Sequence, residues 1–67
     1  MKKLKLVYND IDKIYNDLVY ILADMERELE TMQEDTHDYD TLEEMIDNVR
    51  LCQQNINFSK ENIEEYI

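Results

Sequence analysis

Apolar residues recur every seven positions through the first half of the chain, in three adjacent rows. The a row contains Leu4, Ile11, Leu18, Met25 and Met32. The d row contains Val7, Ile14 and Ile21, and the neighbouring e row contains Tyr8, Tyr15, Leu22 and Leu29. This stripe is wider than a two-stranded coiled-coil seam and predicts one amphipathic helix over about residues 3–34.

The second half repeats the seven-residue spacing less strictly. Its a row contains Leu42, Val49, Ile56 and Ile63, and its d row contains Met45, Cys52, Ser59 and Tyr66. We expect one helix over about residues 41–66, with a possible irregularity near residues 57–59. The alternative is that Ser59 caps a separate short helix.

The segment between the two patterns, residues 35–40, has no period and contains three Asp and one Thr. Such residues favour turns and caps because their side chains bond to nearby backbone. Thr41 with Glu44 has the spacing of a capping box, which predicts a helix start near residue 41. The chain has no Gly and no Pro, which also favours a few long helices.

Two helices of similar length with a short connection should fold back antiparallel, as a single all-α hairpin domain over residues 1–67. Asp10, Asp17 and Asp24 form a g row that would face the Asn residues of the second helix. The paired numbers then sum to 72, and the rows are predicted to hydrogen-bond: Asp10 with Asn62, Asp17 with Asn55, and Asp24 with Asn48.

A hairpin that buries its a and d rows would leave the e row half exposed. Exposed apolar stripes of that length mark interfaces, so Tyr8, Tyr15, Leu22 and Leu29 are predicted contacts. We expect a homodimer that forms a four-helix bundle, with insertion into another protein's groove as the alternative. Tyr20, Leu51 and Phe58 are predicted to form a smaller patch, or else to be isolated surface residues.

The net charge of −10 is concentrated in the middle of the chain. Eleven acids and one base, Arg27, lie between residues 24 and 47, whereas the other residues carry six acids and six bases. An acidic hairpin tip would attract a basic protein surface and repel nucleic acid and anionic membranes. The predicted contacts are Glu30, Glu34, Asp35, Asp38, Asp40, Glu43, Glu44 and Asp47. The alternative is a tip that only keeps the protein soluble.

No arrangement typical of an enzyme, metal site or cofactor site is found. Cys52 in the d row is predicted to be a buried thiol, and His37 lies far from it along the chain. Asp35, His37, Asp38 and Asp40 lack the spacing of a calcium loop and are expected to be exposed turn residues. No apolar run spans a bilayer and no signal peptide is recognised, so we expect a cytoplasmic protein.

The sequence therefore predicts a small non-enzymatic protein that binds another protein. We expect an inhibitor or regulator whose acidic tip occupies a basic, nucleic-acid-binding surface, as phage-encoded anti-defence proteins do. The alternative is an assembly subunit that acts through its apolar helix face. The use of Asn, Ile, Lys and Tyr is typical of an AT-rich bacterial or phage genome.

Overall fold

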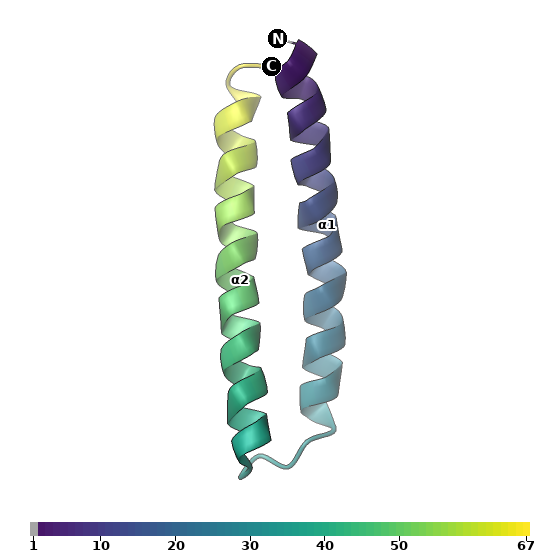
Figure 1. The fold of residues 1–67 in the computed structure, drawn as a ribbon, viewed down its shortest axis with the longest axis vertical. Helices are drawn as coiled ribbons and strands as arrows, with labels where there is room; N and C mark the ends of the chain where they lie inside the picture. The colour runs from purple at the N-terminus through teal and green to yellow at the C-terminus, as the bar shows by residue number, and fades with distance from the viewer. Residues whose placement is uncertain (1) are drawn as a thin grey trace.

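The chain forms an antiparallel hairpin of two long helices (Figure 1). The computed structural model describes the backbone of residues 2–67 and the side chains of residues 3–67. Helix α1 spans Lys2–Glu30 and helix α2 spans His37–Glu64, so both chain termini lie at one end. The described chain measures 51 × 15 × 11 Å. The predicted all-α hairpin is confirmed, and the four-helix bundle stays a prediction.

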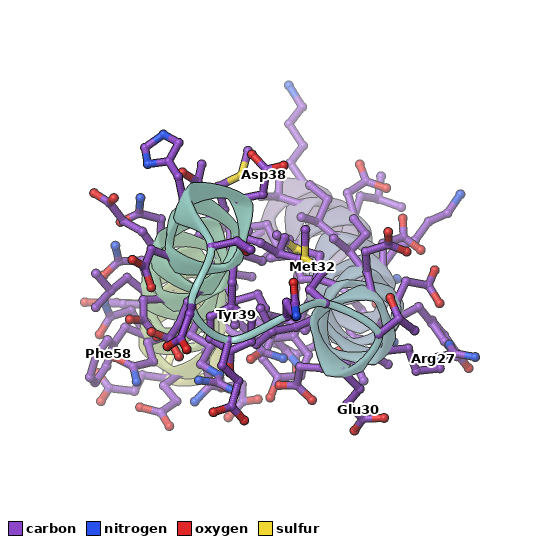
Figure 2. The ribbon with its side chains drawn as sticks, turned by 90° about the horizontal axis from the view of Figure 1, so that it is seen from below. Arg27, Glu30, Met32, Asp38, Tyr39 and Phe58 are labelled. Carbon is purple, nitrogen blue, oxygen red and sulfur yellow. The ribbon has the colours of Figure 1, made fainter. Side chains whose placement is uncertain are left out.

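Helix α2 begins at His37, four residues before the predicted start. Its N-cap is Thr36, whose Oγ1 accepts a hydrogen bond from the Tyr39 backbone N–H at 3.2 Å. The predicted start near Thr41 is therefore wrong. The earlier start places Tyr39 on the inner face of α2, where Figure 2 shows it between the two helices. Partial burial of this ring favours the longer helix.

Helix α1 ends at Glu30 rather than near residue 34. The Thr31 hydroxyl donates to the Glu28 carbonyl oxygen at 2.7 Å, and the Thr31 backbone N–H bonds the same oxygen at 3.1 Å. A threonine that bonds nearby backbone competes with the regular helix ladder. The connection thus covers residues 31–36 instead of the predicted residues 35–40.

Helix α2 continues through Ser59 without a break. The Ser59 hydroxyl donates to the Asn55 carbonyl oxygen, at 3.2 Å, within the same helix. Such a bond to the residue four positions earlier is compatible with a continuous helix. The predicted irregularity near residues 57–59 is therefore absent, and so is the separate short helix.

The helices meet through their a and e rows, not through their a and d rows. Leu22 and Ile46, both e positions, are the two buried hydrophobic side chains of the described part, with 8% and 2% exposure. Tyr8, Tyr15 and Leu29 are half-buried in the same interface. The prediction that the e row stays available to a partner is wrong because α2 already covers it.

The d row, predicted to be buried, is instead exposed. Val7, Ile14 and Ile21 are 45%, 48% and 46% exposed, and Met45 on α2 is 52% exposed. Cys52, predicted to be a buried thiol, is also exposed. Both seams repeat with heptad spacing, but on α1 the e row carries the larger side chains and continues to Leu29, where the d row carries Glu28. Facing the e row of α1 inward therefore buries more apolar area of that helix.

Candidate functional site

The exposed d rows of both helices lie on one side of the hairpin. At 3.6 residues per turn, the d row lies about 80° from the middle of the a and e rows, which face the other helix. Because the helices run in opposite directions and face each other, this rotation carries both d rows to the same side. We call this surface the apolar face, and it consists of Val7, Ile14 and Ile21 of α1 and Met45 and Cys52 of α2.

The g rows form the two margins of the apolar face. They lie about 140° from the direction of the helix–helix contact, so they point outward rather than toward each other. Among the described residues, no cross-helix hydrogen bond joins the predicted pairs, such as Asp17 with Asn55. The rows instead border the apolar face with Asp on α1 and Asn on α2. The predicted Asp–Asn bonding is therefore wrong.

The opposite side of the hairpin carries the polar contacts between the helices. The Tyr8 hydroxyl donates to Glu64 Oε1 at 2.6 Å. Lys60 Nζ lies 2.5 Å from Asp12 Oδ1. The residue numbers of each of these two pairs sum to 72, which is the predicted antiparallel register.

A third contact crosses nearer the closed end, where Arg50 Nη2 lies 2.6 Å from Glu26 Oε1. We call the side that carries these three contacts the ionic edge. The hairpin is therefore two-sided: polar contacts join the helices along one edge, and uncovered apolar side chains lie along the other.

Lys60 is the centre of a cluster that sequence reasoning missed. Its ammonium group lies 4.7 Å from the Tyr15 ring centroid and 5.7 Å from the Tyr8 ring centroid. Its side chain is only 14% exposed. A cation over two aromatic faces is attracted to both rings. The sequence signal for this cluster was the position of Lys60 in the e row of α2, which also contains Ile46.

The cluster changes two proton affinities. The hydrogen bond to Glu64 raises the pKa of Tyr8, with burial as the next cause. The hydrogen bond to Asp12 raises the pKa of Lys60 against the opposing effect of burial. At the closed end, burial raises the pKa of Tyr39, and nearby carboxylates add to the shift. All three shifts favour the protonated form in the folded state.

We expect alkaline pH to destabilise the hairpin. Stability from raised pKa values is fully present below the ordinary values, 10.0 for Tyr8 and 10.5 for Lys60, and is lost as the pH rises through the raised ones. Thermal unfolding followed by circular dichroism should show a melting temperature that falls above about pH 10. The double variant Tyr8→Phe, Lys60→Met should show a shallower fall.

The matched control for this prediction is Tyr20→Phe with Lys13→Met, at two exposed positions outside the cluster. The control should keep the slope of the unaltered protein. Equal slopes for the cluster variant and the control would contradict the assignment of the pH dependence to this cluster.

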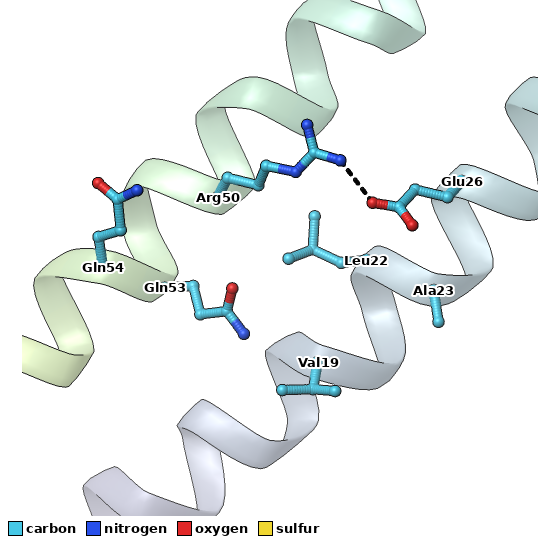
Figure 3. Close-up of a pocket in the computed structure, with 7 residues that line it drawn as sticks. All are labelled: Val19, Leu22, Ala23, Glu26, Arg50, Gln53 and Gln54. Atoms are coloured by element: carbon cyan, nitrogen blue, oxygen red, sulfur yellow. Dashed lines mark hydrogen bonds and ion pairs between the residues drawn. The ribbon is translucent and has the colours of Figure 1, made fainter.

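An open groove lies on the ionic edge near the middle of the hairpin (Figure 3). Its lining residues are Val19, Leu22, Ala23, Glu26, Arg50, Gln53 and Gln54. The Arg50–Glu26 ion pair crosses one side of it. The groove contains amides, alkyl groups and a paired carboxylate, but none of its lining side chains is a Ser, Cys, His or Lys. Its one carboxylate, Glu26, is held in the ion pair with Arg50.

The acids of the middle segment gather at the closed end of the hairpin. All eleven are exposed: Asp24, Glu26, Glu28, Glu30, Glu34, Asp35, Asp38, Asp40, Glu43, Glu44 and Asp47. Arg27 pairs with Asp24, and Arg50 pairs with Glu26 and, at 3.6 Å, with Asp47. The other eight make no ion pair within the described part of the chain. We call this cluster of eleven residues the acidic end.

Most of the predicted contact residues therefore share one location. The acidic end contains all eight acids of the predicted contact set, Glu30, Glu34, Asp35, Asp38, Asp40, Glu43, Glu44 and Asp47. Figure 2 shows that Asp38 and Glu30 point to opposite sides of the hairpin. The acids surround the closed end rather than forming one flat patch.

The predicted patch of Tyr20, Leu51 and Phe58 does not form. Figure 2 shows Phe58 pointing away from α2 on one side and Arg27 pointing away from α1 on the other. Tyr20 lies two turns before Arg27 in the same row. It is 72% exposed, and Leu51 and Phe58 are 56% and 61% exposed. The c rows point in opposite directions because the a and e rows face each other.

No metal-binding cluster and no membrane-spanning helix is present in the described residues. No three His, Cys, Asp or Glu side chains there gather closely enough to hold a metal ion. His37 is the first residue of α2 and is exposed. Neither described helix contains an apolar stretch long enough to cross a bilayer.

Comparison with known proteins gives no relative. No family model, no curated protein and no solved structure matches this chain.

Proposed function

We propose that this protein is a non-enzymatic assembly subunit that binds an amphipathic helical partner through its apolar face. The observation that carries the proposal is the exposure of an apolar row along one side of the hairpin. Ile14, Ile21 and Met45 are each about half exposed although they repeat with core-like spacing. Apolar stripes of this kind mark protein–protein contacts.

The small size of the core supports the same proposal. Two buried hydrophobic side chains, Leu22 and Ile46, provide a small apolar core for the described residues. Domains of about 60 residues are marginal even when compact, and they often gain stability from a partner. A partner that covers the apolar face would complete a bundle core.

The experiment compares two pairs of substitutions on different sides of α1. Ile14→Lys with Ile21→Lys introduces charge into the apolar face. Leu6→Lys with Tyr20→Lys introduces the same charge on the outer side of α1, where Leu6 and Tyr20 are 65% and 72% exposed. Circular dichroism should first confirm that both variants stay helical.

The unaltered protein and both variants are then immobilised and exposed, at low and at high salt, to bacterial lysate to which the free, unaltered chain has been added. We expect the unaltered protein and the outer variant to retain a bound protein at high salt. The amount of protein that the apolar-face variant retains should be at least about tenfold lower, because burying an unpaired lysine is costly. Equal capture by the apolar-face and outer variants would refute the proposal.

The acidic end supports a second candidate function, inhibition of a protein that has a basic surface. Its eight unpaired carboxylates project around one end of the molecule, and such charge speeds association with a basic partner. This binding should weaken with salt because exposed charges are screened beyond about 8 Å at physiological ionic strength. A partner lost at high salt, and insensitive to the apolar-face substitutions, would favour this candidate.

A further inference from the structure

We propose that the occupant of the apolar face is a second copy of this chain, related by a twofold axis that passes beside Ile14. The two acidic ends then lie at opposite poles of a four-helix bundle. This inference rests on the proposed function, because it names the partner that the apolar face binds. Three observations carry it: the exposed area, the order of side chains along the d row, and the position of the charge.

The first observation is the excess of exposed surface. A compact folded monomer of 8.2 kDa exposes roughly 4,500 Å². The hairpin exposes 5458 Å². The excess of roughly 900 Å² is close to the ~800 Å² that each partner buries in a standard interface. One further hairpin of the same size is therefore enough to cover it.

The second observation is the symmetry of the exposed row on α1. Val7, Ile14 and Ile21 are apolar and evenly spaced, and the next d position is Glu28. When two α1 helices cross this interface antiparallel, an axis beside Ile14 places Val7 of each copy against Ile21 of the other. The two Ile14 side chains meet, and Glu28 stays outside the contact. All three apolar side chains are then covered by apolar partners.

The other twofold arrangement keeps both acidic ends at the same pole and places α1 of one copy over α2 of the other. Because residue numbers at the same height on α1 and α2 sum to about 72, Ile14 then lies near Ser59 of the other copy, and Glu28 lies near Met45 of the other copy. Covering a carboxylate with a thioether costs free energy, because the charge loses water and gains no partner. In the arrangement with opposite poles, Glu28 and Met45 both stay outside the contact, so no carboxylate is covered and the side-chain order favours that arrangement.

The third observation is the charge. The acidic end carries eleven of the chain's seventeen acids. Two such ends at one pole would repel, whereas ends at opposite poles of a molecule about 51 Å long lie several screening lengths apart. The whole-molecule charge therefore also favours opposite poles.

The margins of the apolar face are compatible with this arrangement. On α2, Asn55 of one copy lies near Asn62 of the other, and amides both donate and accept hydrogen bonds. On α1, Asp10 of one copy lies near Asp17 of the other, and these like charges repel. Lys3 of one copy lies near Asp24 of the other, and this attraction offsets the repulsion. Neither margin prevents the two faces from meeting.

Sedimentation equilibrium of the purified chain tests the second copy. We expect a mass of twice 8.2 kDa that the variant Ile14→Lys, Ile21→Lys reduces to a single chain. The outer variant Leu6→Lys, Tyr20→Lys should stay dimeric. A monomer at all concentrations would overturn this inference. If capture from lysate still depended on the apolar face in that case, the proposed function would stand with a different partner.

Disulfide cross-linking tests the position of the axis. In a Cys52→Ser background, Ile14→Cys should give a disulfide-linked dimer under a copper–phenanthroline oxidant, because the two positions meet at the axis. Ile21→Cys in the same background should give at least about tenfold less linked dimer. Position 21 of each copy lies about 10 Å along the helix from the axis, at 1.5 Å per residue. Equal linking at both positions, or none at Ile14→Cys in a dimeric protein, would overturn the arrangement.

Discussion

The substitution Ile46→Ala is expected to unfold most of the chain at room temperature. Ile46 is 2% exposed, the lowest value in the described part of the chain. Truncating a buried isoleucine to alanine costs about 2–5 kcal/mol of unfolding free energy. A domain of this length rarely has more than ~3–5 kcal/mol in total. The better helix propensity of alanine returns only about 0.5 kcal/mol.

The measurement is urea unfolding by circular dichroism at one fixed protein concentration, because association would make stability depend on concentration. The control is Leu51→Ala on the same helix, where the side chain is 56% exposed. Exposed substitutions usually change stability by no more than about 0.5 kcal/mol. Similar midpoints for the two variants would show that the a and e rows do not form the core.

The second large effect is expected at the acidic end, where charge reversal should stabilise the hairpin. Glu28 and Glu30 lie at the C-terminal end of α1, which carries the negative pole of the helix dipole. They also lie among nine other acids. We expect Glu28→Lys with Glu30→Lys to add about 1–2 kcal/mol, from the dipole and from relieved repulsion. That corresponds to a melting temperature about 4–15 °C higher.

The matched control reverses two acids at the C-terminal end of the other helix, Glu61→Lys with Glu65→Lys. This variant changes the net charge equally and has a similar relation to a helix dipole, but it lies at the open end, where charges balance. A smaller increase in the control would assign the difference to crowding at the acidic end. Equal increases would mean that the dipole or the net charge accounts for the whole effect.

Salt provides an independent check on the same repulsion. Added salt should raise the melting temperature of the unaltered protein, because screening relieves the crowded carboxylates more than it weakens the two cross-helix ion pairs, Lys60–Asp12 and Arg50–Glu26. The Glu28→Lys, Glu30→Lys variant should show a smaller rise. A melting temperature that falls with salt would indicate that the ionic edge dominates.

The acidic end and the proposed dimer are compatible. A bundle with opposite poles would present one acidic end at each pole, so each remains available to a basic partner. The two candidate functions therefore make different predictions for different variants. Substitutions on the apolar face test assembly, and substitutions at the acidic end test electrostatic binding.

Local pattern in the sequence determined much of the fold. The heptad rows, the absence of Gly and Pro, and the polar middle segment predicted two long helices and their antiparallel register, because backbone geometry converts spacing directly into helix faces. Charge counting also located the acidic end correctly. Helix ends were less well predicted: Thr36 and Thr41 are both suitable caps, and partial burial of Tyr39 favours the earlier one.

The tertiary structure alone decided which rows form the core. The a row belongs to two heptad seams of equal spacing, one with the d row and one with the e row, so periodicity cannot distinguish them. The hairpin faces its e rows inward, where Leu22 and Ile46 are buried and Lys60 lies over Tyr15. A two-helix contact is too narrow to cover a three-row stripe, so covering one seam leaves the other exposed, and the apolar face follows from that choice.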